Sequence, residues 1–248
     1  MKKVKIGGLL DLSTVDYPGK AACVIFMYGC NFRCPFCYNP DLINGEYTEI
    51  EIEKLFELVK KNNFVDAVVI TGGEPTLQEE LFDLCKLLKE NNYLVKLDTN
   101  GSNPEMVDKL IKNKLVDYIA LDVKGPVDER YLGVVRIKNM NIINKIKETM
   151  NILKNSGVEF EFRTPLVPGL NDFPEYLKKQ SEDVKDAKNF VLEQFTPENG
   201  TLDKEFEKIK SPSPGEMKKA ADYFKNENVK IKSRNTIEEP IKPKCVCS

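Results

Sequence analysis

The sequence predicts an α/β protein built around a parallel β-sheet. Short apolar runs, of the kind that form strands buried on both faces, alternate with amphipathic helical segments along almost the whole chain. The connections are short and no internal linker interrupts them, which is typical of repeated βα units. The 248 residues suffice for one sizeable core. We expect an N-terminal segment over residues 1–20, a core domain over 21–235 and a tail over 236–248.

The expected strands are apolar runs bounded by polar or glycine-containing turns. The first is continuously apolar (Ala-Ala-Cys-Val-Ile-Phe-Met-Tyr) and follows residues 13–20, which the Pro18-Gly19 pair indicates to be a loop. In chain order, strands are expected over 21–28, 67–71, 93–98, 118–124, 158–163, 189–195 and 229–233.

The expected helices carry apolar side chains at helical spacing. Thr48 is placed to cap the first of them, and Asn103 followed by Pro104 is a typical start of another. In chain order, helices are expected over 49–61, 77–91, 104–114, 141–155, 172–188 and 214–225.

Unusual polar stretches follow four consecutive expected strands. A group of cysteines follows the first strand, residues 72–75 (Gly-Gly-Glu-Pro) the second, 98–101 (Asp-Thr-Asn-Gly) the third, and 122–124 (Asp-Val-Lys) ends the fourth. Because the carboxyl ends of parallel strands meet at one edge of a sheet, these stretches should converge. The sequence therefore predicts a single site.

Three cysteines, Cys30, Cys34 and Cys37, lie within eight residues after the first strand. Thiolates grouped on a loop bind zinc or iron–sulfur clusters. Closed sites of either kind use four protein ligands, so a local set of three leaves one metal position open. The alternatives are half of a zinc ribbon or buried structural thiols. The tail cysteines Cys245 and Cys247 could complete a zinc site, hold part of another cluster, or have no catalytic part. The odd total of seven cysteines does not suit a disulfide framework.

The composition argues against several function classes. Lys and Arg number 37 against 39 Asp and Glu, so no basic excess indicates nucleic acid or an anionic membrane as a partner. The sequence contains no histidine, which removes Ser-His and Cys-His nucleophilic catalysis and every His-ligated metal site. We find neither a membrane-spanning run nor a secretion signal, and we expect a cytoplasmic protein.

Together these motifs resemble the radical S-adenosylmethionine (SAM) superfamily. The resemblance rests on the spacing Cys-x3-Cys-x2-Cys, on Phe36 before the last cysteine, and on the Gly-Gly-Glu-Pro stretch at 72–75. The start Asp16-Tyr-Pro-Gly-Lys20 is typical of the activases of anaerobic ribonucleoside-triphosphate reductase, a group of glycyl-radical enzyme activating enzymes. The match spans about residues 13–195, and its further segments are 13–19, 28–30, 37–41, 98–101, 120–124 and 167–169.

The resemblance implies a fold and a reaction. The fold would be an open, partial (β/α)6 barrel of the radical SAM type, similar to a TIM barrel. Cys30, Cys34 and Cys37 would hold three irons of a [4Fe–4S] cluster, and SAM would bind the fourth iron. Reductive cleavage of SAM would give a 5′-deoxyadenosyl radical that takes hydrogen from a glycine of a partner glycyl-radical enzyme, most closely anaerobic ribonucleotide reductase. Reduced flavodoxin or ferredoxin would donate the electron, and no side chain would act as a general acid or base.

The resemblance also implies which residues contact SAM. Gly72 and Gly73 would let the backbone approach the cofactor, and Glu74 would accept its ammonium group. The full expected set is Phe36, Cys37, Tyr38, Gly72, Gly73, Glu74, Asp98, Asp122, Val123, Lys124 and Arg163. A monovalent cation beside the cofactor carboxylate would be bound by Asp98, Thr99, Ala120 and Asp122.

Plainer alternatives exist for these residues and for the whole protein. The glycine pair could be a simple strand-to-helix turn, the aromatic side chains could pack in the core, and the charges could be solvated strand ends or surface ion pairs.

One departure matters: the pyruvate formate-lyase activases carry a cofactor-contacting histidine after the segment at 167–169, and this chain has none. The protein-level alternatives are a radical SAM enzyme acting on a small molecule, and an iron–sulfur or zinc protein without catalysis.

Overall fold

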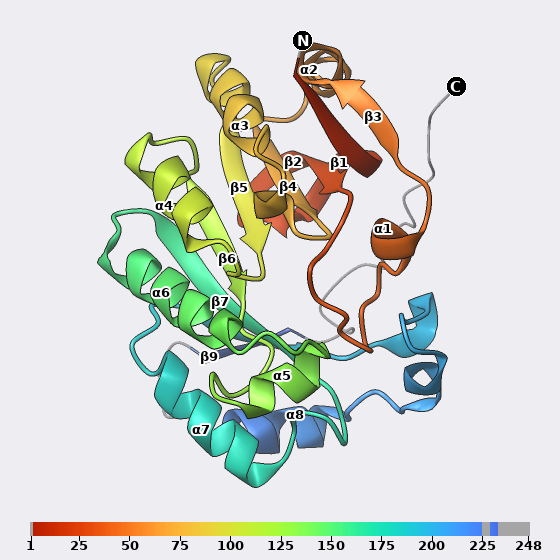
Figure 1. Cartoon of the computed structure of the whole chain (residues 1–248), viewed down its shortest axis with the longest axis vertical. Coiled ribbons are helices and arrows are strands. Elements are labelled where there is room, and N and C mark those ends of the chain that lie inside the picture. The colour runs from red at the N-terminus through yellow and green to blue at the C-terminus, as the bar shows by residue number, and fades with distance from the viewer. Residues whose placement is uncertain (1, 225–228, 233–248) are drawn as a thin grey trace.

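A computed structural model of the chain describes residues 2–224 and 229–232. Within these residues the strands form one curved, open sheet, with helices along its outer side (Figure 1). The strand order is β3-β1-β2-β4-β5-β6-β7-β8-β9. The strands are β1 (Lys3–Tyr17), β2 (Lys20–Met27), β3 (Thr48–Glu51), β4 (Ala67–Gly72), β5 (Leu94–Thr99), β6 (Tyr118–Asp122), β7 (Glu159–Leu166), β8 (Phe190–Gln194) and β9 (Val229–Lys232).

Strand β2 and strands β4 to β9 run parallel, and helices connect most of them. This alternation confirms the predicted fold class, an open partial barrel of βα units. The α-helices are α1 (Asp41–Asn44), α2 (Ile52–Lys60), α3 (Leu81–Glu90), α4 (Pro104–Lys112), α5 (Arg130–Val135), α6 (Asn141–Asn155), α7 (Pro174–Val184) and α8 (Pro214–Ala221). The 3-10 helices are η1 (Pro75–Leu77), η2 (Pro197–Asn199) and η3 (Lys204–Lys208).

Both faces of the central strands are buried. In β2, Ile25 and Met27 belong to the large core that the helices cover, whereas Val24 belongs to a smaller cluster with Val69 and Tyr17. Alternate residues of a strand point to opposite faces, so one continuous apolar run supplies both clusters. This explains why these strands read as unbroken apolar runs in the sequence.

Polar side chains occupy the inner face of the sheet toward the carboxyl ends of its strands. Asp98 in β5 pairs in register with Ala120 in β6, and Asp122 pairs with Arg163 in β7. Lys96 and Asp98 share one face because they are two residues apart in the same strand. The register therefore brings four charged side chains of three strands together.

The predicted loop over residues 13–20 is wrong. Strand β1 continues to Tyr17 and pairs antiparallel with β2, so that residues 18 and 19 form a hairpin turn. Three register shifts interrupt this pairing. Such bulges break the regular alternation of apolar and polar residues, which is the signal that would have indicated a strand.

Smaller differences concern element ends. The helix predicted from residue 49 begins at Ile52, because residues 48–51 form the edge strand β3 against the start of β1. Thr48 therefore lies in a strand and does not cap a helix. Strand β6 ends at Asp122 rather than at residue 124, and the short helices α1 and α5 were not expected. The tail with Cys245 and Cys247 lies outside the described residues.

Over residues 2–224 and 229–232, the structure contains no helix of the length and apolar character needed to span a membrane.

The placement of β1 can be tested by substitution. Tyr17 is 7% exposed and lies against Ala22, Val24 and Val69, whereas Val15 on the same strand is 51% exposed. We expect Tyr17→Ala to lower the free energy of unfolding by about 3 kcal/mol, because it removes a buried ring. The control Val15→Ala should change it by less than about 0.5 kcal/mol. Urea denaturation measures both, and equally small effects would contradict the packing of β1 on the sheet.

Candidate functional site

The predicted site residues line one cavity of ≈ 180 Å³ at the carboxyl ends of the parallel strands. This confirms that the polar stretches converge. The predicted residues on its wall are Cys30, Cys34, Phe36, Cys37, Tyr38, Gly72, Gly73, Asp98, Thr99, Asp122 and Lys124. Four others, Glu74, Ala120, Val123 and Arg163, lie outside that wall, and the first three of them are fully buried.

The cysteine loop follows β2 and is held by backbone hydrogen bonds from several directions. The amide of Cys37 donates to the carbonyl of Cys34 (3.1 Å), which forms a tight turn between the two thiols. The amides of Leu202 and Asp203, in the segment after β8, donate to the carbonyls of Cys37 and Pro35 (3.1 and 3.0 Å). All three thiols of the loop are free. The fold thus presents three reduced cysteines to one cavity.

Burial disfavours the thiolate form of these cysteines in the metal-free protein. It raises the pKa of Cys30 to about 11 and that of Cys34 to about 12. Among residues 2–224 and 229–232, no three His, Cys, Asp or Glu side chains are arranged to hold a single metal ion. A [4Fe–4S] cluster spreads its cysteine ligands over separate irons, whereas a zinc site gathers them around one ion. Three cysteine thiols at one cavity are donors of the kind that hold iron–sulfur clusters.

The glycine pair after β4 packs against the start of the cysteine loop. Gly72 has φ +117°, and a Cβ on Gly73 would lie 2.0 Å from the carbonyl oxygen of Gly29. The amide of Gly73 donates to the carbonyl of Met27 (2.9 Å), and the amide of Glu74 to that of Gly29 (2.7 Å). Both glycines line the cavity as expected, but the structure shows a further reason for them. Only glycine lets these two loops approach so closely.

The Glu74 carboxylate is bound by groups of the protein itself. It is fully buried outside the cavity wall and accepts hydrogen bonds from the side chains of Thr76 (2.5 Å) and Thr99 (2.7 Å) and from the amide of Asn100 (2.6 Å). Burial raises its pKa, and these donors oppose that rise. Glu74 therefore ties the end of β4 to the end of β5.

Five charged side chains form a largely buried cluster at the cavity, and Asp98, Asp122 and Lys124 of this cluster lie in its wall. Asp98 is paired with Lys96 (2.5 Å) and Arg163 (3.3 Å), and their side chains are only 13%, 3% and 13% exposed. Asp122 is paired with the Arg163 guanidinium (2.9 Å) and with Lys124 (3.2 Å). Burial alone would raise the pKa of Asp98, but Arg163 and Lys96 outweigh it and lower the pKa to about 2. The pKa of Asp122 is lowered in the same way by Arg163 and Lys124.

Aromatic rings close the cavity on the side of the cysteine loop. The ammonium of Lys124 lies 5.9 Å from the ring centre of Phe36. Tyr38 stacks on Phe195 (5.9 Å between ring centres), and its hydroxyl accepts a hydrogen bond from the amide of Thr196 (3.1 Å). Phe36 is buried and also lines the cavity, so its ring both packs in the core and forms part of the cavity wall.

Sequence reasoning missed two residues beside the cavity, Lys96 and Tyr131, and seven residues of its wall. The seven are Phe32, Asn39, Ile43, Thr71, Asn100, Pro165 and Glu193. Lys96 could have been found, because it precedes Asp98 by two residues on the same strand face. Asn100 lies in the cavity wall, and Tyr131 of α5 packs edge-on against Phe32 in the cysteine loop (6.3 Å between ring centres). No sequence signal indicates the last contact, because it depends on how α5 folds back over the loop.

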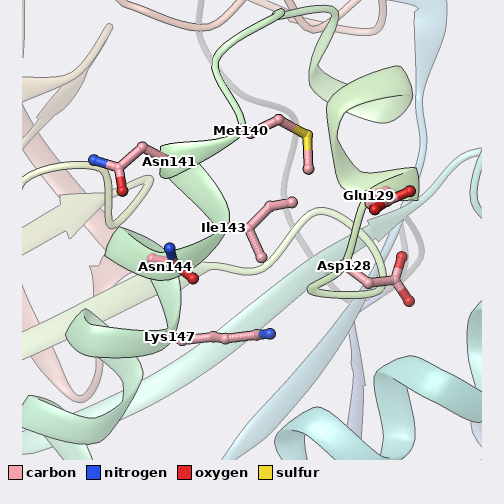
Figure 2. A pocket seen from close by; sticks show the side chains of 7 residues that line it. All are labelled: Asp128, Glu129, Met140, Asn141, Ile143, Asn144 and Lys147. Carbon is pink, nitrogen blue, oxygen red and sulfur yellow. The ribbon is translucent and has the colours of Figure 1, made fainter.

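A larger hollow of ≈ 490 Å³ lies elsewhere, between the start of α6 and the residues before α5 (Figure 2). Its wall carries no cysteine and none of the predicted site residues. It is lined by Asp128, Glu129, Met140, Asn141, Ile143, Asn144 and Lys147. Size alone therefore does not identify the candidate site.

The chain is similar to radical SAM proteins in sequence and in fold. Residues 24–179 match the family model of the Radical SAM superfamily. A protein of Methanocaldococcus jannaschii, provisionally assigned as a glycyl-radical enzyme activating enzyme, is 38% identical over 238 residues, which cover 94% of this chain and 98% of that one. The chain belongs to the glycyl-radical enzyme activating enzymes of the radical SAM superfamily.

Two further proteins are similar to this chain, the first in sequence and the second in fold. The pyruvate formate-lyase-activating enzyme of Listeria monocytogenes is 33% identical over 197 residues, 75% of this chain and 77% of that one. The crystal structure of a radical SAM methyltransferase from Sphaerobacter thermophilus matches with a TM-score of 0.64 at 16% identity, over 94% of this chain and 76% of that one. The latter shows the shared fold. As a radical SAM activating enzyme, the protein is an enzyme of a family that uses a [4Fe–4S] cluster and SAM.

The contact between the glycine pair and the cysteine loop yields a stability prediction. We expect Gly73→Ala to lower the free energy of unfolding by about 3 kcal/mol, because the added methyl group meets a backbone carbonyl that cannot move aside. Gly133→Ala is the matched control, since nothing lies within 4 Å of its added Cβ. Chemical denaturation of both variants measures the difference. An unchanged free energy of unfolding in Gly73→Ala would refute the close contact.

The buried charge cluster yields a pH prediction. The folded-state pKa of Asp98, about 2, lies below the ordinary value of about 3.9, so its stabilising effect is complete above pH ~4 and lost as the pH falls toward 2. Asp98→Asn should therefore cost about 3 kcal/mol at pH 7 and far less near pH 2. Asp108→Asn, which breaks an exposed ion pair with Lys112, is the control and should cost less than about 0.5 kcal/mol. Unfolding of the metal-free protein over a pH series measures both, and a pH-independent cost would contradict the pairing.

Proposed function

We propose that Cys30, Cys34 and Cys37 hold a [4Fe–4S] cluster in this cavity and that SAM binds beside it as the remaining ligand. The reaction proposed is reductive cleavage of SAM and abstraction of hydrogen from a glycine of a partner glycyl-radical enzyme. The observation that carries the proposal is the convergence of three free thiols, a glycine turn and paired charges on one cavity wall. When bound, the reduced cluster supplies the electron that breaks the sulfonium bond.

The cavity wall offers groups that suit the cofactor. SAM carries an ammonium, a carboxylate and a sulfonium, and so it needs charges of both signs. Asp98 and Asp122 offer negative charge and Lys124 positive charge, and the ion pairs around them keep all three ionised. We propose that the backbone at Gly72 and Gly73 lies against the cofactor, and that Phe36 and Tyr38 contact it at the end of the cysteine loop.

Three residues expected to touch SAM are better placed to support the wall. Glu74 joins the ends of β4 and β5 through its carboxylate. Arg163 holds Asp98 and Asp122 from below. The amide of Val123 donates to the carbonyl of Arg163 (2.8 Å), and its own carbonyl accepts from Thr164 and Gln180. We propose that these residues position the groups that line the cavity.

We do not extend the proposal to a monovalent cation. The carboxylates of Asp98 and Asp122 already lie within ion-pair distance of Lys96, Lys124 and Arg163. Two carboxylates facing three protein cations have little remaining attraction for another. The hydroxyl of Thr99 is engaged as well, since it donates to Glu74 and its oxygen accepts a hydrogen bond from the amide of Gly101 (3.1 Å).

The partner proposed is a glycyl-radical enzyme, with two candidates. The Asp-Tyr-Pro-Gly-Lys start at residues 16–20 favours anaerobic ribonucleotide reductase. The similarity to the Listeria pyruvate formate-lyase-activating enzyme favours pyruvate formate-lyase, although this chain lacks histidine altogether. We propose ribonucleotide reductase first, with reduced flavodoxin or ferredoxin as the electron donor.

Cluster loading and radical transfer test the proposal together. The protein reconstituted anaerobically and reduced should convert SAM to 5′-deoxyadenosine. Mixed with anaerobic ribonucleotide reductase or with pyruvate formate-lyase, it should produce a glycyl radical signal by electron paramagnetic resonance in its true partner. Cleavage without a radical on either protein would favour a small-molecule substrate, and absence of cleavage by the loaded protein would reject the reaction itself.

A pair of cysteine variants controls this experiment. Cys34→Ala should lose the cluster and SAM cleavage, because it removes an iron ligand. Cys85→Ala should keep both, because Cys85 is buried on α3 and does not line the cavity. Iron content, absorbance and 5′-deoxyadenosine yield measure the outcome. Retained cleavage in Cys34→Ala would refute the ligand assignment.

A further inference from the structure

The side chain of Asn100 lies between the cysteine loop and the end of β5, and its hydrogen bonds fix how its amide is turned. The backbone amide of Ser102 donates to its side-chain oxygen Oδ1 (2.9 Å). Because a backbone N–H can only donate, the oxygen must be on that side. The nitrogen Nδ2 therefore points toward the cysteine loop, where it lies 2.9 Å from Oδ1 of Asn31 and 4.0 Å from the sulfur of Cys30.

The two hydrogens of this nitrogen need two acceptors. Asn100 is only 5% exposed, so water is a poor substitute for a missing protein partner. One hydrogen is directed to Asn31, whose own amide nitrogen donates onward to the hydroxyl of Ser102 (2.9 Å). The acceptor beside the other hydrogen is the Cys30 sulfur. The backbone amide of Phe32 also donates to this sulfur (3.4 Å), so Cys30 receives a side-chain donor as well as a backbone donor.

We propose that Asn100 is a positioning residue that donates a hydrogen bond to the Cys30 sulfur and thereby raises the reduction potential of the cluster. The inference rests on the proposed function, because it requires a cluster on Cys30. Reduction adds one electron, taken from the external donor, to the cluster and its thiolates, and no bond is made or broken. Hydrogen bonds to the ligating sulfurs stabilise that added negative charge, which makes them one of the levers on cluster potential.

The connection to Glu74 gives this hydrogen bond a fixed geometry. The backbone amide of Asn100 donates to the Glu74 carboxylate (2.6 Å). The backbone amides of Glu74 and of its neighbour Gly73 donate in turn to the carbonyls of Gly29 and Met27 (2.7 and 2.9 Å). The donor is thus anchored to the same glycine turn that packs against the cysteine loop. A donor fixed in this way does not need to reorganise when the charge of the cluster changes.

Redox titration of the loaded protein, without SAM or partner, tests the inference. Asn100→Asp keeps the acceptor for Ser102 and removes the donor to Cys30. At the midpoint potential of the wild-type protein, we expect the ratio of reduced to oxidised cluster in Asn100→Asp to be about tenfold lower, equivalent to a shift of about 59 mV for a one-electron couple. An unchanged potential would overturn the inference.

Asn31→Asp is the matched control, because it adds the same charge nearby and keeps the acceptor for Asn100. Its shift should be clearly smaller. The neutral pair Asn100→Ala and Asn31→Ala repeats the comparison without added charge, and again only the Asn100 variant should shift toward lower potential. Equal shifts within both pairs would show a general effect of charge or structure and would overturn the role of Asn100.

A spectroscopic measurement on the wild-type protein tests the hydrogen bond itself. With asparagine labelled with ¹⁵N at its side-chain amide only, the reduced cluster should show a nitrogen hyperfine coupling that disappears in Asn100→Asp. Absence of the coupling in the wild-type protein, or its persistence in Asn100→Asp, would overturn the inference. A cluster that titrates as expected but does not cleave SAM would reject the proposed function alone, whereas a wild-type protein that takes up no cluster would reject both.

Discussion

The approach of the glycine turn to the cysteine loop is the contact on which the site depends. Parallel pairing of β2 with β4 brings the two loops side by side, and the absence of a side chain at Gly73 lets its backbone meet the carbonyl of Gly29. Glu74 follows this contact in the chain, and its carboxylate accepts hydrogen bonds from Thr99 and Asn100 at the end of β5. The cavity wall is therefore one connected structure of three strand ends.

A second constraint is the group of largely buried charges at the cavity. Placing Asp98, Asp122 and three cations inside a sheet is costly unless each finds its partner. The register of β5, β6 and β7 supplies the partners directly, since Asp122 lies opposite Arg163 and Asp98 is flanked by Lys96 and Arg163. The site thus keeps charges of both signs available to a ligand, although the interior around them is apolar.

Much of this arrangement could be predicted from the sequence. Alternation of apolar runs and helical segments is a local signal, and it sufficed to place the cysteines, the glycine turn and Asp122 at one edge of the sheet. The direction in which a side chain points depends on contacts with residues that are distant in the sequence. Nothing in the sequence shows that the Glu74 carboxylate turns toward Thr99, or that Asn100 points at Cys30. Strand β1 was missed for a different reason, since its register shifts disrupt the alternation that identifies a strand.

The central claim is that SAM completes the coordination of a cluster held by Cys30, Cys34 and Cys37. The most direct measurement uses SAM labelled with ¹⁵N at its amino group, bound to the reduced cluster. The account predicts a hyperfine coupling between the label and the unpaired electron of the cluster, of the size expected for a nitrogen bonded to iron. Labelled SAM that binds the loaded protein without any such coupling would contradict it.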